Sequence, residues 1–222
     1  MSDAPSSSSS KSDAPALLSP TEIRVGFQVS VHECPKLLLR ELKHVFPAQF
    51  ERKAATVGGQ HPTLAVLTCQ KSLMDLSQFG VDADKEKDRL LETFVEFAQH
   101  VSAKLIEKEF WADFIDPCSG LPMLTLQSNK VYSEVDGVEV LLRYRCLSAG
   151  MCKILVHPSW GAAVYPASLF TNAPYDVVQG VIMSSPFNED LKAATASGEP
   201  QPETDADAIT SASSSSSSSA AE

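Results

Sequence analysis

The sequence predicts one α+β domain between two polar tails. Apolar residues alternate from Ile23 to Val31, recur at helical spacing from Asp84 to Lys108, and form several short runs after residue 130. The first pattern has the period of a half-buried strand, and the second has that of an amphipathic helix. Because strands and helices are mixed without a strict strand–helix–strand repeat, a sheet packed against helices is favoured over a doubly wound parallel fold.

The first half of the domain is predicted to contain a strand, a helix and a second strand. Odd positions from Ile23 to Val31 are apolar and even positions are polar or glycine, which indicates one half-buried strand. Pro35 suits the first turn of a helix, which Pro47 should end. The apolar run from Leu64 to Cys69 predicts a strand paired beside the first.

A long helix is predicted from Asp84 to Lys108. Charged residues occupy one side of it, and the other side carries an apolar stripe made of Leu91, Phe94, Ala98, Val101 and Leu105. This stripe should face the core.

The chain after residue 130 is predicted to be rich in strands. Four runs have strand character: Lys130–Val135, Val138–Cys146, Cys152–Val156 and Ala162–Phe170. Asp136-Gly137 lies between the first two runs and is typical of a tight β-hairpin turn.

The two ends of the chain differ in composition from its middle. Serine runs occur at Ser6–Ser10 and Ser213–Ser219. Such segments bury too little apolar surface to offset the entropy of ordering. We therefore expect a disordered leader at 1–20, one domain at 21–186, and a disordered acidic, serine-rich tail at 187–222.

Charge and hydropathy argue against nucleic acid and membrane partners. Most of the formal net charge of -10 lies in the tail, and the middle of the chain is close to neutral, without a basic patch. No apolar run approaches the roughly 18 residues of a membrane span. Arg24 is the first arginine and Asp3 and Asp13 precede it, so no mitochondrial presequence is evident and the cytoplasm is the expected location. The five cysteines have no repeated spacing, which favours reduced thiols over a disulfide framework.

The segment from Phe110 to Pro122 combines large apolar residues, two carboxylates and a turn. Asp116 precedes Pro117 and is followed by Gly120, which is typical of a strand entering a tight turn whose amides donate to the carboxylate. We interpret Asp113, Asp116, Pro117 and Gly120 as structural turn residues. The catalytic alternative is an acid/base pair formed by the two aspartates.

Cys152 is the candidate reactive thiol, because it follows a turn at Ala149-Gly150 and precedes Lys153. A neighbouring cation lowers the pKa of a thiol. The alternative is a small core residue, since free cysteine is among the most buried types. Neither a zinc-ligand spacing nor a glycine-rich phosphate-binding loop occurs, so no intrinsic metal or nucleotide cofactor is expected.

Several sequence blocks are similar, in order, to those of one known family. They are Glu33-Cys34-Pro35-Lys36-Leu37-Leu38, His44-Val45-Phe46-Pro47, Leu67-Thr68-Cys69-Gln70-Lys71, Trp111 to Leu121, Gly150-Met151-Cys152-Lys153, Ser159-Trp160-Gly161 and Phe170-Thr171-Asn172-Ala173. Over roughly residues 23 to 176 the sequence resembles the CblD family of cobalamin (vitamin B12) trafficking proteins.

This resemblance implies a nitroreductase-like α+β sheet with packed helices and without a flavin site. It also implies an adapter rather than an enzyme. Members bind CblC, the protein that removes the upper ligand of cobalamin, and help to direct the cofactor to methionine synthase or methylmalonyl-CoA mutase. Cobalamin would then be bound through the partner and not by this chain alone, and the cytoplasmic methionine synthase branch is the expected one.

The family's thiol segment departs from its usual sequence here. The segment matching Gly150 to Lys153 usually has the sequence Gly-Cys-Cys-Lys, whose thiolate can coordinate cobalt, whereas this chain has Met151 and Cys152. The candidate cobalt ligands in a partner complex are therefore the Cys152 thiolate and the Met151 thioether, and surface contact without ligation is the third alternative. Two enzymatic alternatives are a flavin-dependent reductase on the same fold and a thiol-based enzyme.

Overall fold

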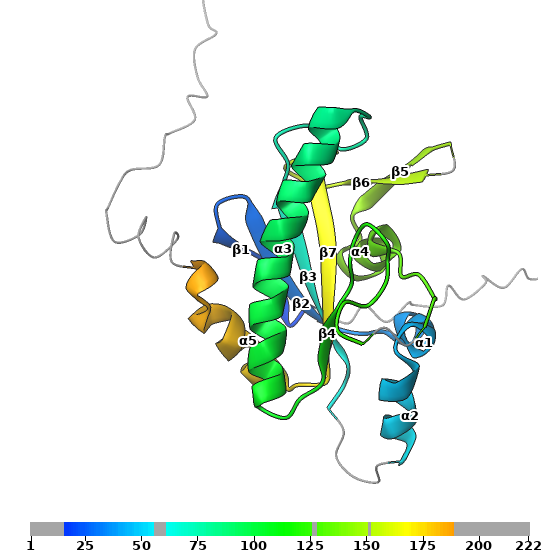
Figure 1. The fold of residues 1–222 in the computed structure, drawn as a ribbon, viewed down its shortest axis with the longest axis vertical. Coiled ribbons are helices and arrows are strands. Elements are labelled where there is room, and N and C mark those ends of the chain that lie inside the picture. Colours follow the sequence, from blue (N-terminus) through cyan, green and yellow to red (C-terminus); the bar gives the residue numbers. More distant parts are fainter. Residues whose placement is uncertain (1–15, 56–60, 126–127, 151, 189–222) are drawn as a thin grey trace, which may run out of the picture.

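A central antiparallel sheet separates two layers of helices (Figure 1). The computed structural model describes residues 16–55, 61–125, 128–150 and 152–188, so most of the predicted leader and tail lies outside the described residues. Within these ranges the predicted α+β class is confirmed.

The sheet has five strands in the order β1-β2-β3-β7-β4, each antiparallel to its neighbours. Their bounds are Leu18–Arg24, Phe27–Glu33, Leu64–Lys71, Val164–Thr171 and Ala112–Phe114. Strand β3 pairs with β2 along its length, which confirms the predicted pairing of this run.

The single strand predicted from Ile23 to Val31 is wrong, because these residues form a hairpin. Arg24 is paired with Phe27, and Val25 and Gly26 make a two-residue turn in which Gly26 has φ 71°. A two-residue turn by itself would reverse the odd/even alternation, but the register shift between Glu22 and Arg24 restores it, so the period alone does not reveal the reversal. Gly26 was the signal, since a positive φ suits glycine.

One face of the sheet is covered by α3 (Val81–Glu107) and α5 (Tyr175–Ser184). The predicted long helix is thus confirmed, and Phe94, Phe97 and Val101 lie in its core stripe. The chain continues into a 3-10 turn, Pro186–Asn188, where Phe187 packs against Phe27 with ring centroids 4.8 Å apart. Phe187, the first residue of the predicted tail, is therefore part of the core.

The opposite face is covered by three helices and a two-stranded ribbon. The helices are α1 (Lys36–Val45), α2 (Pro47–Ala55) and α4 (Glu134–Leu142), and the ribbon consists of β5 (Arg145–Ala149) and β6 (Cys152–Val156). Pro47 ends the predicted helix α1 as expected and also opens α2.

The hairpin predicted at Asp136-Gly137 is wrong, since both residues lie in α4. Ser133 is the N-cap of this helix, and its Oγ accepts a hydrogen bond from the Asp136 amide at 3.3 Å. The strands predicted at 130–135 and in the first part of 138–146 are wrong for the same reason, and β5 begins only at Arg145. The Ser-x-x-Asp pattern of a helix start was the stronger signal.

No helix in the described part of the chain combines the length and the hydropathy of a membrane-spanning segment.

Candidate functional site

The β5–β6 hairpin carries the candidate ligand segment at its turn. Ala149 is paired with Cys152, so Gly150, with φ 62°, and residue 151 make a two-residue connection. Met151 lies outside the described residues, and Cys152 is described through its backbone at the start of β6. The structure thus places Gly150 next to the end of a ribbon that extends from the body (Figure 1), and Cys152 opens the second strand of this ribbon.

Helix α4 braces this ribbon through Lys153. The Lys153 ammonium donates to Asp136 Oδ1 at 2.6 Å and to Glu139 Oε2 at 3.1 Å. These hydrogen bonds, above all the one to Asp136, raise the pKa of Lys153, so the lysine stays charged. Two carboxylates share its single positive charge, and the electrostatic help that Lys153 was expected to give a neighbouring thiolate is therefore offset.

The base of the ribbon is fixed to the sheet by His157. Its Nδ1 accepts hydrogen bonds from the amides of Ser159 and Trp160, both at 3.2 Å, so the proton lies on Nε2, which donates to Gln28 Oε1 at 3.1 Å. The ring also stacks on Trp160, with centroids 4.0 Å apart. Burial lowers the pKa of His157, in agreement with a neutral ring.

The predicted turn residues form a loop closed by two carboxylates. Asp116 accepts from the Cys118 amide at 3.0 Å and from Ser119 Oγ at 2.7 Å. Asp113 is fully buried and accepts from the amides of Leu124 and Thr125, both at 2.9 Å.

Pro117 lies inside the Asp116 turn, and Gly120, with φ 70°, donates its amide to the Asp116 carbonyl at 2.7 Å. A Cβ on Gly120 would lie 2.7 Å from the Tyr132 carbonyl oxygen, so the loop packs closely on the segment that leads into α4. The oxygens of both aspartates are thus occupied by donors of their own loop.

A buried polar cluster beneath α4 escaped the sequence analysis. Glu134 accepts a hydrogen bond from Ser168 Oγ through Oε2, whereas Glu134 Oε1 and Tyr132 Oη have no hydrogen-bond partner among the described residues. Burial raises the pKa of Glu134 to about 8, so this carboxyl is neutral at pH 7. The sequence analysis placed Glu134 in a predicted strand at 130–135. It therefore gave no sign that this carboxyl is buried at the start of α4.

The described residues contain no group of three or more His, Cys, Asp or Glu side chains that could hold a metal ion.

Comparison with known proteins shows which family this chain is similar to. The sequence model described as "methylmalonic aciduria and homocystinuria type D protein" matches residues 3–182. A protein named cobalamin trafficking protein CblD from Gallus gallus is 31% identical over 149 residues, which is 67% of this chain and 47% of the relative. The proteins of the same name from Rattus norvegicus and Homo sapiens are 32% and 31% identical over 150 residues, with the same shares. The chain thus spans about half the length of the curated relatives it matches.

Proposed function

Because the chain belongs to the methylmalonic aciduria and homocystinuria type D protein family, we propose that it is a cobalamin trafficking adapter without a reaction of its own. It binds a CblC-type protein loaded with cobalamin and helps to direct the cofactor to methionine synthase, with methylmalonyl-CoA mutase as the second destination. The fold is a nitroreductase-like sheet that binds no flavin. The chain contacts cobalamin only through its partner.

The observation that carries this proposal is the braced hairpin. A two-residue turn is narrow enough to enter the cofactor cleft of another protein, and its root is held by His157 against the sheet. Lys153 ties β6 to α4. A ribbon whose root and second strand are held in this way loses little conformational entropy when it docks, which favours binding.

The turn offers two soft ligands for cobalt. A thiolate from Cys152 is the stronger candidate, because a metal favours loss of the thiol proton. Met151 offers a thioether, which needs no deprotonation. Either ligand would add a charge-transfer band to the absorption spectrum of the partner-bound cobalamin.

The test mixes the full chain with a cobalamin-loaded CblC-type protein and follows size exclusion and absorbance. We expect a complex with a ligand-to-cobalt band that Cys152→Ser removes, while Cys146→Ser, a control thiol on the same ribbon, keeps it. A band that survives Cys152→Ser and is lost in Met151→Ala would assign the thioether. A complex without any band would mean adapter contact without ligation, and the absence of a complex would refute the proposed function.

A further inference from the structure

Helix α1 carries a stripe of positive charge along its outer side. Lys36, Arg40 and Lys43 are exposed and follow one another at intervals of four and three residues, which places them on one side of an α-helix. The opposite side of the helix is buried in the core and consists of Leu38, Leu42 and Val45. We call the three outer cations the basic stripe.

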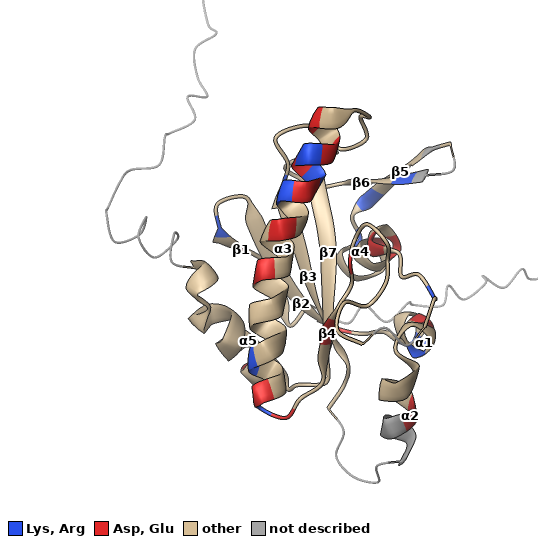
Figure 2. Ribbon diagram, viewed as in Figure 1, with Lys and Arg blue, Asp and Glu red and all other residues tan. Residues whose placement is uncertain are grey.

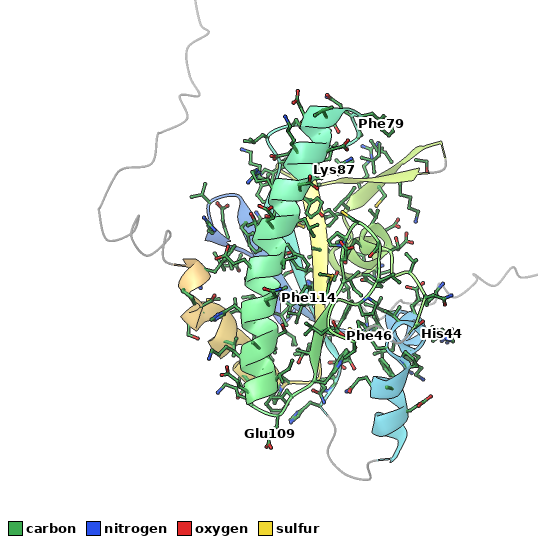
Figure 3. The ribbon with its side chains drawn as sticks, viewed as in Figure 1. His44, Phe46, Phe79, Lys87, Glu109 and Phe114 are labelled. Carbon is green, nitrogen blue, oxygen red and sulfur yellow. The ribbon has the colours of Figure 1, made fainter. Side chains whose placement is uncertain are left out.

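The basic stripe has no counter-charge in the described part of the chain. None of its three side chains makes an ion pair or a hydrogen bond there, whereas Lys153 of β6 is held by two carboxylates of α4. Glu41 is the one acidic residue of α1, and it lies about 100° around the helix from Arg40. His44 adds a basic side chain near the end of the helix, and Figure 3 shows it at the outer side of α1.

The near-neutral charge of the whole domain therefore hides a local positive surface. Figure 2 shows basic residues on α1, whereas α4, which covers the same face of the sheet, is marked by acidic ones. An acidic ligand of this face would be attracted to α1 and repelled by α4. The charge pattern thus restricts an anionic partner to one helix.

The complementary charge is present in this chain, after the last described residue. Beyond Asn188 the sequence has seven carboxylates and one lysine, which is a net charge of -6. Four of these carboxylates are concentrated in residues 199–207, with no basic residue among them: Glu199, Glu203, Asp205 and Asp207. We call residues 199–207 the acidic segment. Residues 1–15, at the other end of the chain, have a net charge of only -1 and offer no comparable complement.

We propose that the acidic segment docks on the basic stripe of the same molecule, an inference that does not depend on the proposed function. Alternate residues of an extended chain point to the same side, so Glu203, Asp205 and Asp207 would present carboxylates about 6–7 Å apart. The basic stripe presents its cations about 6 Å and about 4.5 Å apart along the axis, because an α-helix rises about 1.5 Å per residue. The two rows of charge therefore match in spacing as well as in sign.

The acidic segment can reach α1 from the place where the described chain ends. Asn188 follows α5, on the face of the sheet opposite to α1 (Figure 1). Glu203 comes 15 positions later. A fully extended chain of that length spans about 50 Å. A domain of this size has a radius of gyration of about 16 Å and a diameter of about 40 Å. The segment can therefore pass round the edge of the sheet while the fold stays intact.

Tethering favours this segment over the acidic surface of another protein. Each exposed ion pair is weak in water, so the basic stripe would bind a free anion poorly. A flexible tether of suitable length holds its segment at a local concentration of about 1 mM. A separate protein present at about 1 µM would have to bind about 1,000 times more tightly to displace it. The acidic segment thus shields α1 from other anionic molecules.

Zero-length cross-linking of the full chain tests the contact directly. A carbodiimide joins a lysine to a carboxylate only where the two groups touch, so the monomer should yield amide links from Lys36 and Lys43 to the acidic segment. Their yield should fall by about tenfold in about 1 M salt, where the Debye length is only about 3 Å. Three exposed lysines elsewhere serve as control lysines and should give few links: Lys71, Lys85 and Lys108.

Backbone amide resonances give a second readout on full-length variants. Glu203→Gln combined with Asp205→Asn and Asp207→Asn should shift the signals of α1 and leave those of the other helices in place. Replacing the three cations of the basic stripe with glutamine should in turn shift the signals of the acidic segment. Replacing the three control lysines with glutamine removes the same charge and should not shift them. Circular dichroism should show the same folded spectrum for all variants.

Three results would overturn the inference. Links from α1 to the acidic segment that occur only in cross-linked dimers would assign the segment to a second copy of the chain. Equal yields on the basic stripe and on the control lysines would mean general attraction of an acidic segment to any cation. Unchanged α1 signals in the variant with the neutralised acidic segment would leave the basic stripe as a solvated surface.

Discussion

Replacing Glu134 with glutamine should change how the stability of this protein depends on pH. In the folded protein the carboxyl is buried under α4 and its pKa is about 8, whereas in the unfolded chain the pKa is near 4.5. Between these values the folded state keeps a proton that the unfolded state has released. Stability contributed by the neutral carboxyl is therefore present below pH 4.5 and is lost as pH rises through 8.

The loss of stability caused by ionisation of Glu134 is easiest to measure above pH 6.5. Burial lowers the pKa of His32 to about 4, and this group makes the protein more stable as pH rises from 4 to 6.5, opposite in sign to Glu134. His157 acts in the same direction as His32. At pH 6.5 the unfolded histidines are still about half protonated and offset part of this loss, so the Glu134 contribution is read as the difference between wild type and Glu134→Gln, in which it should amount to about 1–2 kcal/mol between pH 6.5 and 8.

Urea unfolding at half-unit steps from pH 6.5 to 8 measures this loss. Glu134→Gln keeps the size of the side chain but cannot ionise, so its free energy of unfolding should not fall over the range and should rise relative to that of the wild type. Glu96→Gln, on the exposed side of α3, is the matched control and should follow the wild type. Parallel curves for wild type and Glu134→Gln would refute the assignment of Glu134 as a buried neutral acid.

Three further substitutions test a glycine in α4, a glycine in α5 and the Asp116 turn. Gly137→Ala should destabilise the fold by about 1–3 kcal/mol, because the new Cβ would lie 1.9 Å from Tyr132 Oη, while Gly180→Ala, in open space on α5, should stabilise it by up to about 1 kcal/mol. Thermal and urea unfolding check both, and a stable Gly137→Ala would mean that Tyr132 does not lie beneath α4. Asp116→Ala should cost about 1–2 kcal/mol by removing acceptors from its turn amides, and the folded fraction should still bind the partner. Wild-type stability combined with lost partner binding would instead make this carboxylate functional.

The sequence predicts best those elements whose pattern is long and needs no tertiary information. Helix α3 offers more than six turns of one apolar stripe, so its prediction survives errors at the ends. Helix α4 has only nine residues and contains Val135, Val138 and Val140, which favour a strand by propensity. The helix begins at the Ser133 cap, and it packs closely on Tyr132 because Gly137 has no side chain. The contact between Gly137 and Tyr132 exists only after folding.

The candidate site is predictable only in part for a similar reason. The turn at Gly150 and the strand after it follow from local sequence, but the link from Lys153 to Asp136 depends on the helix that the sequence pattern failed to show. The exposure of Leu73 and Phe79 could not be predicted either, because their side chains resemble core residues in the sequence. The hydrogen bond from the Leu73 amide to Glu86 of α3, which fixes the start of this loop, exists only after folding.

Strand β3 has no side that faces water, and this limits which sequences the strand accepts. Leu64 and Val66 lie in the core beneath α3, while Ala65 and Leu67 lie in the core beneath α1 and α4. Its polar residue Gln70 is also buried, with its amide donating to the Leu90 carbonyl at 2.7 Å. A missense change from residue 64 to 70 therefore meets a packed layer whichever way the new side chain points. Natural variation in this protein should be sparse along β3 and concentrated where one face of an element is open.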